Sequence, residues 1–415
     1  MLNERISRRD LLRCSGVALL GASASGWMPL LADEAARQGA KKKSVILLYM
    51  NGGASHVDTF DPKPGLTEFK AISTATPGMQ FAEHLPTLAK LSKEMAVIRS
   101  MNTSEGSHAR ARYYVHTGYR EGQGGVIHPT LGSLLSATVG AKKPELPNFV
   151  SISGGALGPG YLGPVHASLQ IEDPNRGIND LKPNGRIDEF DEKISVLEQM
   201  EKGFVERKQT PAAVAHQATY EAAVKLMHSE KAKAFELSQE SESVAAKYGS
   251  SKFGRGCLLA RRLVEFGVPF VEVDMGGWDT HKDNFTRVKN LSQQLDQGMG
   301  GLLADLKERG MLDSTLVIWM GDFGRTPEVK GGGRGHFPKA WTTILAGGGL
   351  KTGGAVGKTD DRGASIVDRR VGINDFLATI CKTVGVDYTK DLHTRSGRPI
   401  RIVDKGEKPL SELLG

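Results

Sequence analysis

The sequence predicts a three-layer α/β/α domain around a mostly parallel central sheet. Two observations carry this prediction: short apolar runs rich in strand formers recur along the chain, and segments with helical periodicity lie between them. Strands that alternate with helices are typical of α/β folds. The strand candidates span 44–50, 94–100, 147–153, 268–275, 314–320 and 341–348, and the helix candidates include 130–138, 252–266, 285–309 and 372–384.

The N-terminal segment, residues 1–32, has the pattern of a twin-arginine export signal. Positions 7–12 read SRRDLL, and a modest apolar stretch with small residues follows. A short membrane anchor is the alternative, but Arg13 and Pro29 interrupt the stretch, so it would span a bilayer poorly. We therefore expect no stable transmembrane span, the twin-arginine translocase as a partner during export, and a periplasmic or extracellular (cell-surface) location.

The α/β domain is expected over residues 43–400. Its first strand, 44–50 (SVILLYM), is a continuous apolar run, as in a central parallel strand. Residues 186–250 differ, because they are charged, rich in Ala, Glu and Lys, and helical in period. We interpret them as a helical insertion over one edge of the sheet, either an exposed cover without a role or a substrate lid. Residues 401–415 form a C-terminal tail in this division.

Polar residues follow several strand candidates, at the place where ligands bind in sheets of this kind. Segments 51–65, 102–120, 273–284 and 316–338 each hold side chains suited to metal ions or anions. A hydroxyl and an arginine near a helix N-terminus also suit phosphate or sulfate. The alternative is a purely structural role, in which the aspartates cap helices and the histidines are only hydrogen-bonded. The candidates are Asn51, His56, Asp58, Ser107, His108, Arg112, Asp274, Asp279, His281, Asp322, Arg325, Arg334 and His336.

This mixture of carboxylates and imidazoles predicts one or two divalent metal ions. Zn²⁺ and Mn²⁺ suit it best, whereas Ca²⁺ and Mg²⁺, the alternatives, prefer mainly oxygen ligands. The formal net charge is +7, but Lys and Arg are dispersed, without a long basic run or interleaved aromatic residues. We therefore expect no nucleic acid as a partner, and the mild positive charge is compatible with anionic substrates.

The chain is identified as a member of the DUF1501 family of exported proteins by motifs between about 45 and 355. They read NGGASHVDTFDPKPG, GSHARARYYVHTGYR, GGWDTH, GDFGRTP, GGRGHFPKAW and LAGGGLKTG, and INDFLATICKTVGVD at 373–387 extends the match. The order of these motifs is similar to that of the alkaline phosphatase and sulfatase superfamily. This resemblance implies an alkaline-phosphatase-like fold that carries the helical insertion.

The same resemblance implies roles for individual residues. Segment 108–118 parallels the helix that opens with the sulfatase nucleophile, and Arg112 stands at the arginine of that motif. His108 aligns with the nucleophile itself, and Ser107 precedes it. The positions that parallel metal ligands are Asp279, His281, Asp322 and His336.

The chain also departs from the superfamily pattern. Asn51 ends the first strand where relatives usually have Asp, and Phe323 stands at the usual position of a second ligand. No Cys occupies the nucleophile position, so a formylglycine sulfatase of the usual type is excluded. A second metal site would be incomplete, rebuilt from His56 or Asp58, or absent.

The leading hypothesis is an exported metal-dependent hydrolase of phosphate or sulfate esters. Its substrate would be an anionic ester, such as a sulfated or phosphorylated glycan or a small molecule. Ser107 is the nucleophile candidate, and His108 would bind metal, act as a base or be the nucleophile itself. Arg112 would hold the anion, with help from Arg325 or Arg334. One metal would bind Asp279, His281 and His336, with Asp274 as an optional further ligand, and a second would bind Asp322 with Asn51, Asp58 or His56. The alternative is a non-catalytic secreted binding or scaffold protein on the same fold.

Overall fold

The computed structural model describes residues 43–415, apart from 143, 179–180, 182–188, 191, 198 and 200–210. The predicted export signal over 1–32 lies outside the described residues, as does much of the first part of the predicted insertion. Among the helices described, none combines the length and the apolar character that a bilayer crossing requires.

The core of the domain is a sheet of eight strands in the order β12-β4-β11-β8-β1-β7-β5-β6. Every neighbouring pair is parallel except the two that include β11, which runs antiparallel to β8 and β4. All six predicted strands belong to this sheet, and the predicted α/β class is confirmed. The strands are β1 (Ser44–Met50), β4 (Met95–Met101), β5 (Phe149–Ile152), β6 (Leu169–Ile171), β7 (Phe270–Met275), β8 (Thr315–Gly321), β11 (Trp341–Gly347) and β12 (Gly354–Val356).

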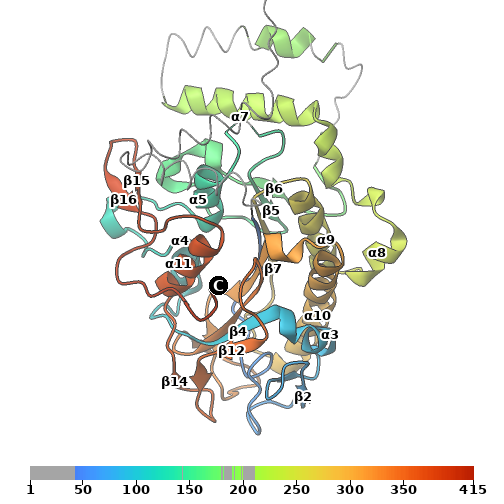
Figure 1. Cartoon of the computed structure of the whole chain (residues 1–415), viewed down its shortest axis with the longest axis vertical. Coiled ribbons are helices and arrows are strands. Elements are labelled where there is room, and N and C mark those ends of the chain that lie inside the picture. The colour runs from blue at the N-terminus through green and yellow to red at the C-terminus, as the bar shows by residue number, and fades with distance from the viewer. Residues whose placement is uncertain are drawn as a thin grey trace, which may run out of the picture. The chain divides into compact units, whose positions relative to one another are not determined.

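Helices cover both faces of the sheet, with α4, α5 and α11 on one side and α3, α9 and α10 on the other (Figure 1). Side chains of β1 alternate between the two cores, since successive residues of a strand point to opposite faces. Ile46 and Leu48 join the core under α9 and α10, while Val45 and Leu47 join the core under α11. The described helices include α3 (Pro86–Lys90), α4 (His108–Thr117), α5 (Leu131–Thr138), α7 (Pro211–Met227), α8 (Glu242–Lys247), α9 (Lys252–Glu265), α10 (Asn284–Glu308) and α11 (Ile373–Thr383).

Short ribbons and 3-10 turns complete the domain. The described part of the predicted insertion is helical and includes α7, which contacts the turns η5 (Pro164–His166) and η6 (Glu230–Phe235). The remaining strands form two-stranded ribbons. They are β2 (Ala71–Ser73) with β3 (Gln80–Ala82), β9 (Gly324–Arg325) with β10 (His336–Phe337), β13 (Lys358–Thr359) with β14 (Ile366–Asp368), and β15 (Asp391–His393) with β16 (Pro399–Arg401).

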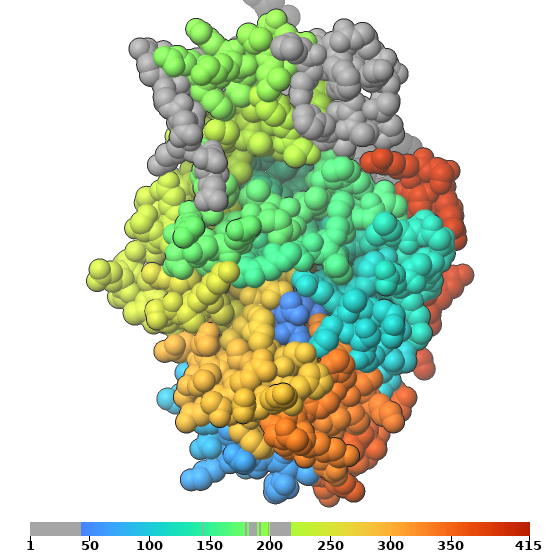
Figure 2. Space-filling model, turned by 180° about the vertical axis from the view of Figure 1, so that it is seen from behind, coloured from blue at the N-terminus to red at the C-terminus, as the bar shows by residue number. Residues whose placement is uncertain are grey.

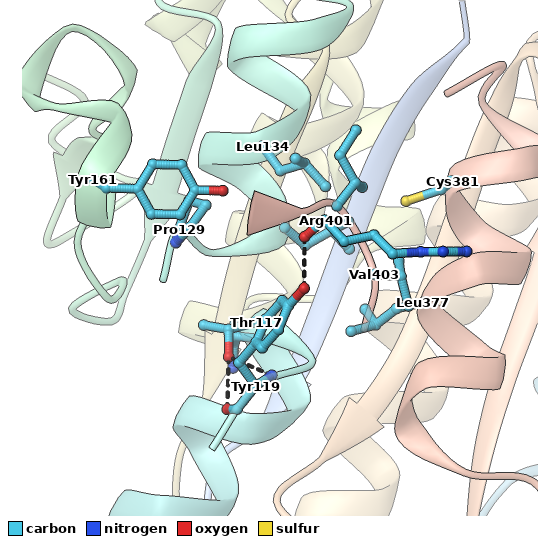
Figure 3. Close-up of a pocket in the computed structure, with 12 residues that line it drawn as sticks. Thr117, Tyr119, Pro129, Leu134, Tyr161, Leu377, Cys381, Arg401 and Val403 are labelled. Atoms are coloured by element: carbon cyan, nitrogen blue, oxygen red, sulfur yellow. Dashed lines mark hydrogen bonds between the residues drawn. The ribbon is translucent and has the colours of Figure 1, made fainter. Parts of the chain in front are cut away.

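The C-terminal segment 401–415 packs against the domain. Val403 and Leu410 are buried in the core shared with α11. The hydroxyl of Tyr119, just after α4, donates to the carbonyl of Arg401 at 2.6 Å (Figure 3). The sequence analysis treated this segment as a separate tail. In the structure it helps to hold the C-terminal end of α4 in place.

The strand directions decide which loops meet. The carboxyl ends of β1, β4, β7 and β8 lie at one edge of the sheet, because these strands run the same way. β11 runs the opposite way, so its first residue lies at that same edge, and the segment 324–340 that leads into it must cross there. Every candidate site segment is thus delivered to one edge.

Candidate metal centre

The helix α4 brings the first histidine to this edge. It begins at His108 after the loop from β4, and Ser107 is its N-cap residue. The hydroxyl of Ser107 makes no capping hydrogen bond, so it is free for another role. Gly118 ends the helix with φ 75°, a left-handed conformation that glycine adopts without strain.

Three imidazoles and one carboxylate converge in front of α4. The Nε2 atoms of His281, His108 and His336 lie 3.1, 3.3 and 3.5 Å from Oδ1 of Asp279. Ligand atoms of His108, Asp279 and His336 all lie within 4.8 Å of one another, so a single cation could touch them together. His281 is the outermost member, with half of its side chain exposed.

The hydrogen bonds of the imidazoles leave their Nε2 atoms as ligands. Nδ1 of His336 donates to the carbonyl of Gly106 at 2.7 Å, because a carbonyl only accepts. Nδ1 of His108 donates at 2.5 Å to Oδ2 of Asp322, which also accepts from the backbone N–H of Gly52. Metal-binding histidines usually donate their second ring N–H to a carbonyl or carboxylate in this way.

The Nε2 atoms themselves are not satisfied by ordinary hydrogen bonds. Nε2 of His108 is buried and makes no hydrogen bond within the described residues. Nε2 of His281 lies 3.1 Å from Nε2 of His336, so a proton or a cation must lie between the two nitrogens. The donor set of imidazole nitrogens and a carboxylate oxygen therefore fits Zn²⁺ or Mn²⁺.

Asp322 lies behind His108 and contacts its Nδ1 atom. It is not one of the residues whose ligand atoms converge. Its side chain is 1% exposed, and its Oδ1 accepts from the hydroxyl of Tyr49. Burial raises the pKa of Asp322 to about 7, although the Gly52 N–H and the charge of Arg325 oppose the shift. Above that pH the ionised carboxylate orients His108, whose own pKa burial lowers, so the imidazole is neutral and able to bind metal.

Asp279 is held by a buried arginine. Nη2 of Arg325 donates to Oδ1 of Asp279 at 2.5 Å and also to the carbonyl of Gly52. Burial alone would raise the pKa of Asp279, but Arg325 and the nearby imidazoles outweigh it and keep that pKa below its ordinary value. The ring of Phe323 lies 4.9 Å from that of His108 and closes the inner side of the cluster.

A second polar group lies along β7, beside the cluster. Arg112 contacts the carboxylate of Asp274 at 3.5 Å and donates to the carbonyl of Gly155 at 2.9 Å. The side-chain amide of Asn51 donates to Asp274 at 3.4 Å. Burial raises the pKa of Asp274 to about 6, and Arg112 opposes that shift. Asn51 and Arg112 are thus engaged with Asp274 rather than with the imidazoles.

Two members of this polar group were not among the sequence candidates. Glu272 is 1% exposed, and its Oε1 lies 3.4 Å from Nε2 of His116, which is also buried. The available signal was the acidic residue inside the apolar run 268–275, since a buried carboxylate in a strand needs a cationic partner.

The remaining candidates are Asp58, Arg334 and His56, and the first two form a separate buried pair. Arg334 binds both oxygens of Asp58 at 2.7 Å, and both side chains are 0% exposed. Asn284 also donates to Asp58 at 2.9 Å. His56 is buried and bonded to the carbonyl of Gly363 at 2.8 Å. The structure therefore gives Asp58, Arg334 and His56 partners that hold loops together, outside the converging atoms.

The surface view places these loops in one hollow. In Figure 2 the blue chain at the end of β1 is seen at the bottom of a hollow, between the cyan segment around α4 and the gold and orange segments that follow β7 and β8. A ligand entering there would reach the strand ends directly.

The family model described as protein of unknown function (DUF1501) matches residues 42–414. The chain belongs to the DUF1501 family. The match spans the whole described domain, from before β1 to the C-terminal segment. No curated protein matches this DUF1501 chain.

Solved structures similar to this DUF1501 chain include members of the alkaline phosphatase superfamily. The PsFucS1 sulfatase from Pseudoalteromonas sp. is 16% identical, with 86% of this chain and 70% of that chain covered and a TM-score of 0.42. BT1596, a 2-O GAG sulfatase, is 10% identical (89% and 74% covered, TM-score 0.44). The periplasmic domain of EcEptC from Escherichia coli, in complex with Zn, is 12% identical (88% and 95% covered, TM-score 0.40). At such identities these likenesses assign neither a substrate nor a metal to this chain.

Proposed function

We propose that this DUF1501 protein is a metal-dependent hydrolase of phosphate or sulfate esters that works without a formylglycine. The observation that carries the proposal is the set of hydrogen bonds from Nδ1 of His108 and His336, which leaves both Nε2 atoms directed at Asp279. In this proposal His108, Asp279 and His336 hold the ion, with His281 at its exposed side. A bound divalent ion polarises an ester oxygen and lowers the pKa of a nearby hydroxyl or water.

The groups around the cluster have separate roles in this proposal. The hydroxyl of Ser107, which no capping bond occupies, is the candidate nucleophile, with a water molecule as the alternative. Its oxygen would form the new bond to phosphorus or sulfur while the bond to the leaving alcohol oxygen breaks, and its proton would pass to that alcohol. A water molecule would then hydrolyse the seryl ester, which releases the inorganic anion and restores the hydroxyl. The uncapped N–H groups at the start of α4 favour the anion's outer oxygens. Arg325 keeps Asp279 ionised and oriented.

This proposal revises the ligand assignment made from the sequence. His108 joins Asp279 and His336 in place of His281. Asp322, assigned from the sequence to a second metal, becomes the group that orients His108. A single ion is proposed rather than two, because Phe323 packs 4.7 Å from the ring of His336 and fills the inner side.

Metal content and turnover test the proposal together. The full chain would be loaded with Zn²⁺ or Mn²⁺, dialysed, analysed for bound metal and assayed on aryl phosphates and aryl sulfates. We expect about one ion per chain and hydrolysis of at least one ester class. His336→Ala should lose the ion and the activity but remain folded, whereas His393→Ala, at an exposed histidine of β15, should change neither.

A non-catalytic binding protein is the second candidate function. Two observations favour it: Phe323 occupies the inner side of the cluster, and the guanidinium of Arg325 already neutralises Asp279 at 2.5 Å. Protein that binds no transition metal and hydrolyses no ester in the assay above would establish this candidate in place of the hydrolase.

We also propose export by the twin-arginine route, on the pattern SRRDLL at positions 7–12. Replacing Arg8 and Arg9 together by lysine should retain the protein in the cytoplasm of a host with a twin-arginine translocase. Cell fractionation measures this, and export of the double variant at the normal level would contradict the route.

A further inference from the structure

A cavity adjoins the exposed side of the metal centre. It has a volume of about 420 Å³, within the range of small-molecule sites. One wall is His281, the outermost imidazole of the cluster, and the rest comes from the loop between β9 and β10 and from the loop that follows β13. A molecule bound at the cluster could therefore extend into this cavity without a change in the fold.

Three lysine and arginine side chains line the cavity. Lys330 is exposed, and its ammonium has no hydrogen bond or ion pair within the described part of the chain. Arg362 is also exposed and is bonded to Glu328. Arg334 at the base is neutralised by Asp58, so the cavity keeps an excess of one positive charge from Lys330.

The loop that carries Lys330 is held in a defined shape. The N–H of Lys330 donates to the carbonyl of Gly333 at 2.9 Å, and the N–H of Thr326 donates to that of Gly335 at 3.0 Å. Gly331 bends the chain between them with φ 61°. A charge on a fixed turn loses less freedom on binding than one on a loose loop, so it favours a specific partner.

Glu328 competes only weakly with a ligand anion for Arg362, because their ion pair is exposed. Their side chains are 51% and 73% exposed, and pairs of this kind contribute little to stability. An incoming anion can therefore take Arg362 from Glu328 at small cost. The cavity then offers two cations to one ligand group.

We propose that this cavity binds a second anionic group of the substrate, carried on the same molecule as the ester held at the metal centre. The substrate class is then a bis-anionic ester, such as a sugar unit or short glycan that bears two sulfates or two phosphates. The inference rests on the proposed function for the position of the first group. It adds that Lys330 and Arg362 select for the second.

Binding measured without turnover tests this inference. The probes are a disulfated disaccharide, the same disaccharide with one sulfate, and the corresponding phosphate esters, titrated calorimetrically into the zinc-loaded full chain. We expect the disubstituted probe to bind about fivefold more tightly than the monosubstituted one, because an exposed charge pair contributes about 1 kcal/mol to the binding free energy. The comparison of the sulfate and phosphate series identifies the anion that the cavity prefers.

Two variants that remove charges of opposite sign from the cavity sharpen the test. Lys330→Gln should remove the preference for the disubstituted probe and leave the monosubstituted one unchanged. Glu328→Gln should strengthen the preference about twofold, because it releases Arg362. Lys382→Gln, at an exposed lysine of α11 outside the cavity, is the matched control and should change neither affinity.

Equal affinities of the two probes for the wild-type chain would overturn the inference, as would a Lys330→Gln variant that weakens both probes alike. Its failure is distinct from that of the proposed function. A chain that hydrolyses aryl esters but shows no preference retains the hydrolase and loses the second subsite. A chain that shows the preference but hydrolyses nothing retains the subsite and loses the hydrolase.

Discussion

The contact between Asp322 and His108 makes the sharpest prediction about the metal centre. Asp322→Ala removes the acceptor of the Nδ1 proton of His108, so the imidazole is free to rotate and to change tautomer. Loss of such an outer partner typically lowers metal affinity by about 10–100-fold, and we expect the upper end because the aspartate is buried. The expected loss is therefore about 3 kcal/mol of zinc binding free energy.

Asp322→Asn should fall between this variant and the wild-type chain. The Gly52 N–H needs an acceptor, so the amide oxygen should take the position of Oδ2 and keep the hydrogen bond with His108. The charge is lost but the tautomer is kept, and we expect a loss of about tenfold. Tyr49→Phe is the control, since it removes only the hydroxyl that donates to Oδ1.

Competition with a chromophoric chelator at pH 8 measures the zinc affinities of the wild-type chain and the three variants, and thermal unfolding of the metal-free proteins separates metal loss from misfolding. The reasoning is refuted if folded Asp322→Ala binds zinc as tightly as the wild-type chain. It is also refuted if Tyr49→Phe costs as much as Asp322→Ala, because the effect would then come from packing.

Three further predictions concern the surrounding structure. The pKa of Asp274 is about 6 in the folded chain against an ordinary 3.8, so the folded state holds the extra proton. As the pH rises from 4 to 6, Asp274 should therefore contribute a fall of about 3 kcal/mol in the stability of the metal-free protein, on top of the fall from Asp322, whose pKa is also raised. Asp274→Asn should remove this fall in urea denaturation; an unchanged profile would contradict it. Gly333→Ala should destabilise the chain by about 1–3 kcal/mol, since a Cβ there would overlap the backbone of the loop after β7. Gly335→Ala meets only an ordinary contact at 3.5 Å and should be near neutral, and equal effects would disprove this account. Asp58→Asn should cost about 3–5 kcal/mol in stability by leaving Arg334 unpaired, while metal content stays unchanged. A loss of bound metal from the folded variant would return Asp58 to the ligand set.

Much of the fold could be predicted from local patterns. The runs at 44–50 and 314–320 are continuous and apolar because β1 and β8 are covered on both faces. Burial on both faces requires apolar residues at successive positions, and the sequence shows this pattern directly. The reversed direction of β11 could not be predicted, since nothing in the run 341–348 encodes which neighbour it pairs with. That reversal is what brings the segment holding His336 back to the site edge.

The candidate site divides in the same way. The sequence alone identified the strand ends and the residue types that meet there, because polar groups interrupting apolar runs are visible without a structure. Which of those groups converge was decided by tertiary structure. Asp58 and Asp322 look alike as acids after strand ends, but one is paired with Arg334 and the other supports His108. The physical reason is that a buried carboxylate takes the role its nearest donor allows, and those donors come from segments more than 200 positions away.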